Sequence, residues 1–78
     1  AMSLSPNWAE AKHLAGLANY MMKNYAAAVA LYQAALNFDQ ANPLIHKRLG
    51  MAYREMGDPT SAAQAFRKYL ELAPDAPD

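Results

Sequence analysis

Apolar residues recur along this chain at three- and four-residue steps, the spacing that places them on one face of an α-helix. Two such series stand in the second half of the chain: Leu49, Ala52, Tyr53 and Met56, and then Ala62, Ala65, Phe66, Tyr69 and Leu70. Each stripe must be buried against another helix, because the polar positions between its members belong on the solvent side. The pattern predicts an all-helical chain.

Helix start and stop signals divide the chain into four segments. Ser5-Pro6, Asn42-Pro43 and Asp58-Pro59 each pair a side-chain oxygen that can cap free backbone N–H groups with a proline suited to the first helical turn. Asn24 can cap a further start, and Gly57 suits the left-handed backbone that ends many helices. These signals predict four helices: Pro6–Met22, Tyr25–Phe38, Pro43–Met56, and Pro59 to Leu72 or Ala73.

The two halves of the chain repeat each other at one constant offset. The offset that aligns Gly16 with Gly50 also aligns Ala28 with Ala62, and no gap is needed between the copies. A period of about 34 residues is typical of helix-turn-helix units that stack into a solenoid. Glycine inside a helix costs about 0.5–1 kcal/mol relative to alanine. We therefore expect Gly16 to face Ala28, and Gly50 to face Ala62, in a close helix approach.

The sequence resembles the tetratricopeptide repeat family. In residues 43–76 the residues at the family's spacings are Leu49-Gly50, Tyr53, Gly57-Asp58, Ala62, Phe66 and Pro74. Residues 9–42 match in register through Gly16, Tyr25, Ala28, Tyr32, Ala35 and Leu36, and depart from the family at Lys12, Asn19 and Gln40. The resemblance implies an all-α fold: two tandem helix-turn-helix repeats, 9–42 and 43–76, forming a short right-handed α-solenoid.

The remaining residues are interpreted as flanking segments. Residues 1–8 hold the start of the first helix and Ala1, which stands before Met2 and is read as a remnant of cloning. Residues 77–78 form a tail. We expect a fragment of a larger scaffold or adaptor, because arrays of this kind usually need three or more repeats for stability.

The resemblance also implies a function, the binding of a peptide or protein segment in a concave groove lined by the first helix of each repeat. Transferring the family's groove positions to this sequence nominates eleven residues: Glu10, His13, Leu17, Tyr20, Met21, Leu44, Lys47, Arg48, Met51, Arg54 and Glu55. Lys47, Arg48 and Arg54 can hold carboxylates, which favours a partner of acidic character. The alternative reading is that these are ordinary solvated helix charges.

The open end of the second repeat supports another function. Met51, Ala65, Tyr69 and Leu72 are expected to stay partly exposed there, and a contiguous apolar patch usually marks a partner surface. The alternative to groove binding is therefore a self-associating unit that dimerises through its uncapped helical ends. Its contact residues would be Ala65, Tyr69 and Leu72.

Charge and composition exclude several other functions. The charges of seven basic and seven acidic side chains cancel, so the chain has no net charge. Binding to nucleic acid or to anionic lipid requires a positive excess, so neither partner is expected. No stretch is long and apolar enough to span a membrane, and no signal pattern is seen. The cellular location stays open, with a cytoplasmic one expected for the chain as given.

The sequence predicts no metal, no cofactor and no catalysis. The chain has no cysteine, and its two histidines lie on different helix faces, since His46 stands one position before the equivalent of His13 in the second repeat. We expect His13 to face the groove and His46 to be buried and hydrogen-bonded. The serines stand at helix starts, where capping explains them, and the three glycines are isolated rather than grouped in a phosphate-binding loop.

Overall fold

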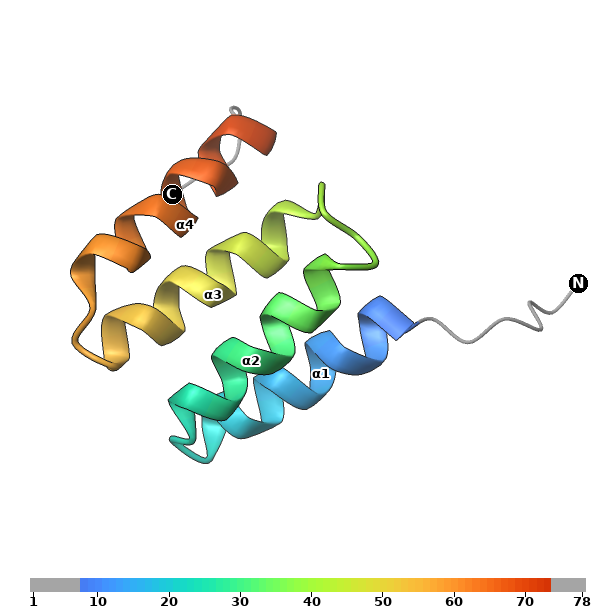
Figure 1. Ribbon diagram of the computed structural model, residues 1–78, viewed down its shortest axis with the longest axis vertical. Coiled ribbons are helices and arrows are strands. Elements are labelled where there is room, and N and C mark those ends of the chain that lie inside the picture. The colour runs from blue at the N-terminus through green and yellow to red at the C-terminus, as the bar shows by residue number, and fades with distance from the viewer. Residues whose placement is uncertain (1–7, 74–78) are drawn as a thin grey trace, which may run out of the picture.

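A computed structural model describes residues 8–73, which form four consecutive α-helices, each running antiparallel to the next (Figure 1). The helices are α1 (Trp8–Met21), α2 (Tyr25–Leu36), α3 (Pro43–Glu55) and α4 (Pro59–Leu72). Helices α1 and α2 pack as one hairpin, α3 and α4 as another, and α2 packs against α3. The predicted all-α fold of helix-turn-helix repeats is confirmed.

The predicted helix boundaries agree closely with the observed ones. The expected start at Ser5-Pro6 lies outside the described residues. Helix α2 ends two residues before Phe38, because the N–H groups of Asn37 and Phe38 bond to carbonyls three residues back and tighten the last turn. Helix α3 ends one residue before Met56, whose N–H bonds to both Ala52 and Tyr53.

Two of the predicted caps form and one does not. The Asn42 side chain accepts a hydrogen bond from the Leu44 N–H at 3.0 Å, and Asp58 accepts one from the Ser61 N–H at 3.2 Å. Asn24 makes no capping hydrogen bond; its amide instead donates to the Asn19 side chain at 3.5 Å. The prediction for Asn24 is therefore wrong, because its side chain does not cap the N-terminus of α2.

The turns within the two hairpins share a left-handed residue. Gly57 has φ +81°, as its place after α3 predicts, and Lys23, the equivalent residue of the first repeat, has φ +67°. Glycine adopts this conformation readily, whereas a residue with a Cβ is strained in it. The two repeats therefore have the same turn geometry with different residues.

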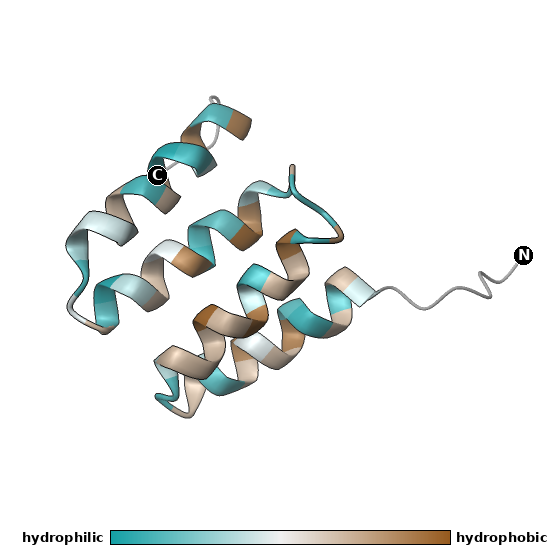
Figure 2. Ribbon diagram, in the orientation of Figure 1, coloured by the Kyte–Doolittle hydropathy of each residue, from teal (hydrophilic) through white to brown (hydrophobic). Residues whose placement is uncertain are grey.

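The core lies around α2, which is hydrophobic along most of its length and stands between α1 and α3 (Figure 2). Tyr32 of α2 and Ile45 of α3 are the largest fully buried side chains among the described residues. They belong to a continuous cluster of buried residues: Ala28, Val29, Tyr32, Ala35, Ile45, Leu49, Ala52 and Ala65. The second hairpin thus covers one side of the first.

The helix glycines lie at close approaches, as predicted, but at both of them the nearest atoms belong to an aromatic ring rather than to the expected alanine. A Cβ on Gly16 would lie 2.7 Å from the Tyr32 ring and 3.3 Å from the Ala28 carbonyl oxygen. A Cβ on Gly50 would lie 2.8 Å from the ring of Phe66, rather than nearest to Ala62. An aromatic ring therefore occupies the space above both glycines, since Tyr32 and Phe66 are also equivalent residues of the two repeats.

Candidate interaction groove

The inner side of the helix stack is formed by α1 and α3. The backbones of these two helices approach each other, whereas the backbones of α2 and α4 do not within residues 8–73. Consecutive hairpins that touch on one side and separate on the other must curve toward the side of contact. The surface between α1 and α3 is therefore the concave side, and we call it the groove.

Two adjacent pockets lie along the groove. The first, of about 190 Å³, is mainly apolar and lies among five residues: Leu17, Tyr20, Tyr32, Arg48 and Met51. The second, of about 380 Å³, is more polar and lies among nine: Ala9, Glu10, His13, Leu14, Asp39, Asn42, Leu44, Ile45 and Arg48. Arg48 is common to both, so its side chain separates an apolar pocket from a polar one.

A hydrogen bond between the two repeats fixes the position of Arg48. One guanidinium nitrogen lies 3.0 Å from Nε2 of His13, with the guanidinium donating, since arginine has no acceptor. The imidazole is 8% exposed and its ring meets that of Tyr32 edge-on, with the centroids 5.9 Å apart. His13 thus joins α1 to both α2 and α3.

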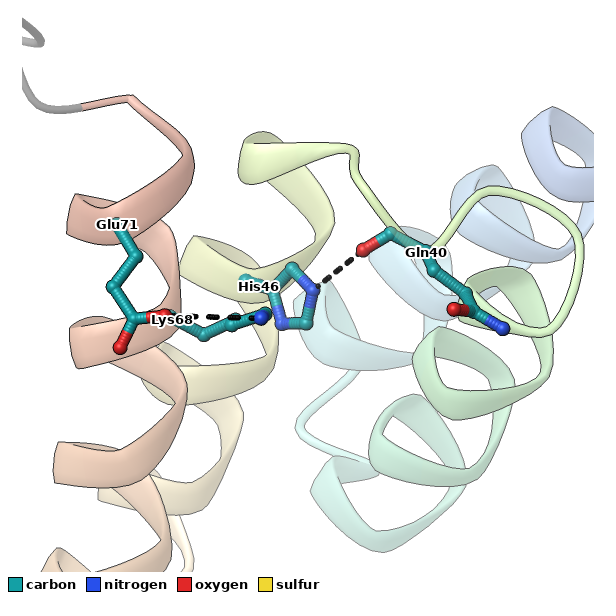
Figure 3. Close-up of polar contacts among 4 residues, drawn as sticks. All are labelled: Gln40, His46, Lys68 and Glu71. Atoms are coloured by element: carbon teal, nitrogen blue, oxygen red, sulfur yellow. Dashed lines mark hydrogen bonds and ion pairs between the residues drawn. The ribbon is translucent and has the colours of Figure 1, made fainter.

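The structure corrects the expectation for one of the two histidines. His13 borders the polar pocket of the groove, although only 8% of the residue is exposed because α3 covers this part of the first hairpin. His46 is partly exposed rather than buried, and its Nε2 lies 3.0 Å from the Gln40 carbonyl oxygen (Figure 3). Figure 3 also shows the neighbouring α4 and its ion pair between Lys68 and Glu71, at 3.7 Å. The predicted hydrogen bond of His46 exists, but the predicted burial does not.

The surroundings of His13 hold it in the neutral form. Burial is the largest cause that lowers the pKa of His13, the positive charge of Arg48 lowers it further, and Glu10 opposes them. Burial likewise raises the pKa of Tyr32, whose hydroxyl is buried without a hydrogen-bond partner among the described residues. A neutral imidazole accepts the hydrogen bond from Arg48, whereas an imidazolium would place two cations in contact.

We expect the stability of the fold to fall with pH below the ordinary histidine pKa of 6.5. Since the pKa of His13 is lower in the folded state, the unfolded chain binds more protons between that lower pKa and 6.5, and protonation favours unfolding. The contribution of neutral His13 to the free energy of unfolding is complete above pH 6.5 and is lost as the pH falls through the folded-state pKa of His13. Urea unfolding on both sides of pH 6.5 measures it.

A matched pair of variants tests whether His13 causes this loss of stability in acid. His13→Gln removes the titrating group but keeps a side-chain acceptor for Arg48, so it should reduce the loss of stability in acid. His46→Gln leaves His13 in place and should retain that loss. An unchanged pH profile in His13→Gln would show that the effect arises elsewhere.

Seven of the eleven nominated groove residues surround the two pockets: Glu10, His13, Leu17, Tyr20, Leu44, Arg48 and Met51. Met21 is exposed near the end of α1, and Arg54 and Glu55 are exposed at the end of α3, where their charged atoms lie 4.0 Å apart. Lys47 lies apart from both pockets, with its Nζ 5.6 Å from the centroid of the Tyr69 ring.

The structure adds lining residues that the helix pattern does not nominate. Tyr32 comes from α2, and Asp39 and Asn42 come from the connection between the hairpins. Tyr32 follows the repeat period, which by itself favours a packing role. The residues expected from the sequence all come from the first helix of each repeat. In the structure, α2 and the segment between α2 and α3 also contribute side chains to the groove.

The nominated self-association residues also lie in different surroundings. Ala65 is 7% exposed and belongs to the core, because it faces α3, so its expected exposure is wrong. Tyr69 and Leu72 are partly buried, and the more exposed neighbour is Leu70 at 53%. A pocket of about 470 Å³ lies among Phe66, Tyr69 and Leu70 of α4 and Lys47 of α3. We call this surface the open face of α4.

Two further findings concern other classes of site. Between residues 8 and 73 there is no group of three or more acidic or histidine side chains arranged to hold a metal ion. Over the same residues, no helix combines the length and the apolar character needed to cross a bilayer.

Comparison with known proteins identifies the same repeat in two overlapping parts of the chain. A family model described as "TPR repeat" matches residues 16–57, more than half of the chain. A second model, described as "Tetratricopeptide repeat", matches residues 43–76. No curated protein matched the sequence. The first match spans α2, α3 and part of α1, and the second spans α3 and α4, so together they include α3 and the second half of α1 in the groove.

Proposed function

The chain belongs to the tetratricopeptide repeat family, and on that premise we propose that its groove binds a peptide segment of a partner protein. Repeats of this family are generally protein–protein interaction modules and typically non-catalytic. The feature of this chain that carries the proposal is Arg48, held between an apolar and a polar pocket.

The size of the apolar pocket favours one side chain of a peptide over a whole cofactor, although the neighbouring polar pocket is larger, at about 380 Å³. Sites for small molecules usually enclose about 300–1,000 Å³ and bury most of the ligand. The apolar pocket, at about 190 Å³, is smaller than that and suits a single side chain. A segment lying along the groove would place one apolar side chain between Leu17 and Met51.

Charge favours an acidic residue next to that apolar side chain. Arg48 carries five N–H donors and shares one nitrogen with His13, so donors remain for an acceptor on the partner. Arginine binds carboxylates in a two-pronged geometry that gives both energy and orientation. The proposed ligand is therefore a short segment in which an Asp or Glu lies beside an apolar residue.

Selection from a random peptide library displayed on phage tests the groove. We expect the selected peptides to combine acidic and apolar residues, and to bind Arg48→Glu about ten- to a hundred-fold more weakly, the range for a lost charged hydrogen bond. Met51→Glu should also weaken binding, by introducing a charge into the apolar pocket. The measurement is peptide affinity by fluorescence anisotropy, with circular dichroism confirming that each variant is folded.

Arg67→Glu provides the matched control. Arg67 is exposed on α4 and outside both groove pockets, so the same charge reversal there should leave affinity unchanged. If folded Arg48→Glu and Met51→Glu bind the selected peptides as the parent does, the groove is not the binding site.

Self-association is a second candidate, favoured by the 53% exposure of Leu70. Molar mass by light scattering over a wide concentration range tests it. A dimer that persists on dilution and is lost in Leu70→Glu would support it, and a monomer at all concentrations would argue against it.

A further inference from the structure

The two aromatic rings that cover the helix glycines differ by one hydroxyl group. Tyr32 packs over Gly16, and its equivalent Phe66 packs over Gly50. A phenylalanine ring therefore suffices for this kind of packing. Tyr32 is fully buried, and its hydroxyl has no hydrogen-bond partner among the described residues. Because an unpaired buried polar group destabilises the folded state, the hydroxyl requires an explanation other than the packing of the ring.

The hydroxyl lies toward the apolar pocket of the groove. Tyr32 is one of the five residues that line this pocket. Two of the others are close enough to act on the pKa of Tyr32: burial raises this pKa most, the charge of Arg48 lowers it, and Tyr20 raises it. The polar end of the Tyr32 ring therefore lies near Arg48 and Tyr20, at the floor of the pocket.

The side chains around this floor can move aside for a ligand. Leu17 and Tyr20 of α1, and Arg48 and Met51 of α3, are all partly exposed at the pocket. Methionine is unbranched and adapts its shape to a neighbouring group. A ligand side chain that enters between Leu17 and Met51 therefore reaches the floor at which the Tyr32 hydroxyl lies.

The unpaired hydroxyl selects the chemistry of that ligand side chain. Arg48 cannot accept the Tyr32 O–H, because a guanidinium group has only donors. A wholly apolar side chain would leave the hydroxyl unpaired, and a carboxylate would lose its hydration in the apolar pocket. An amide would bring a second polar atom that also needs a partner. A tyrosine combines an apolar ring with one hydroxyl at the end far from the peptide backbone.

On the basis of the proposed groove function, we infer that the apolar residue of the bound segment is a tyrosine, next to the Asp or Glu that pairs with Arg48. Tyr32 is the residue that determines this specificity, because its hydroxyl forms a hydrogen bond with the hydroxyl of the incoming tyrosine. Leu17 and Met51 contact the faces of the incoming ring.

A double-mutant cycle tests the hydrogen bond. A peptide from the phage selection is made in two forms, with Tyr or Phe as the apolar residue next to its acidic residue. Fluorescence anisotropy measures the affinity of both forms for the full chain and for Tyr32→Phe. We expect the parent to bind the tyrosine form about five-fold more tightly, a factor typical of one neutral hydrogen bond. Tyr32→Phe should lose this preference or favour the phenylalanine form.

The unbound chain gives a second measurement that needs no peptide. Tyr32→Phe should be at least as stable to urea as the parent, because it removes an unpaired hydroxyl and introduces the residue that the second repeat already has. Tyr25→Phe is the matched control for binding. It removes a hydroxyl from the same helix, outside both groove pockets, and should retain the preference for the tyrosine form.

Three results would overturn the proposal. The first is equal affinity of the parent for the two peptide forms, and the second is a preference for tyrosine that Tyr32→Phe retains. The third is a clear loss of stability in Tyr32→Phe, since the hydroxyl would then already have a partner within the folded chain. None of these results bears on the groove itself, which fails as the binding site only if folded Arg48→Glu and Met51→Glu bind as the parent does.

Discussion

Replacing Ile45 with alanine should leave a large fraction of the chain unfolded at room temperature. Ile45 is 1% exposed and lies in the cluster that joins the two hairpins, between α2 and α3. Truncating a buried isoleucine to alanine typically lowers the free energy of unfolding by about 2–5 kcal/mol. A core in a chain of this size rarely supplies more than about 3–5 kcal/mol in total. The expected loss is therefore comparable with the whole stability.

Thermal unfolding followed by circular dichroism measures this loss, and Leu44→Ala is its control. Leu44 precedes Ile45 on the same helical turn but is 42% exposed, so its truncation should lower the midpoint much less. Similar midpoints for the two variants would show that the interface between the hairpins is not where the stability resides.

Alanine at Gly16 and at Gly50 should have unequal effects, although the two positions are equivalent in the repeat. At Gly16 the new Cβ would lie 2.7 Å from the ring of Tyr32, which is fully buried, and 3.3 Å from the backbone carbonyl oxygen of Ala28. Overpacking costs about 1–3 kcal/mol, and the gain in helix propensity returns about 0.5–1 kcal/mol. Gly16→Ala should therefore lower the free energy of unfolding by about 1 kcal/mol, near the middle of the net range that these two effects give.

At Gly50 the ring in contact belongs to Phe66, which is partly exposed on the open face of α4. That ring can rotate outward, so Gly50→Ala should change the stability by less than about 0.5 kcal/mol. Urea unfolding of the two single variants and the parent compares them directly. A larger destabilisation at Gly50 than at Gly16 would contradict the view that burial of the contacting ring decides the cost.

Much of the secondary structure follows from local sequence signals. Asn42-Pro43 and Asp58-Pro59 start helices at the predicted residues, and Gly57 takes the left-handed conformation that ends α3. Asn24 shows where such signals fail, because its side chain bonds to Asn19 instead of capping α2. A capping residue provides the acceptor, but the path of the preceding turn decides whether it reaches the helix N-terminus.

The candidate groove is predictable to the extent that it depends on helix faces. Leu17, Tyr20, Arg48 and Met51 are nominated by their positions and do line one pocket. Lys47 is assigned by position to the same surface as Arg48 but points toward Tyr69, since adjacent positions on a helix differ by about 100°. Only the direction of each side chain relative to the next helix shows that Arg48 lines the groove and Lys47 does not.

The sequence by itself determined the repeat, the helices and the family, because these depend on the constant offset between the two copies and on three- and four-residue steps within each helix. The tertiary structure decided which members of equivalent pairs are buried. Tyr32 is covered because α3 packs on the first hairpin, whereas Phe66 has no such cover among residues 8–73. His13 is likewise enclosed by α2 and α3, and His46 stands at an edge. Burial depends on neighbours distant in sequence, so equivalent positions in the two repeats have different environments within the described residues.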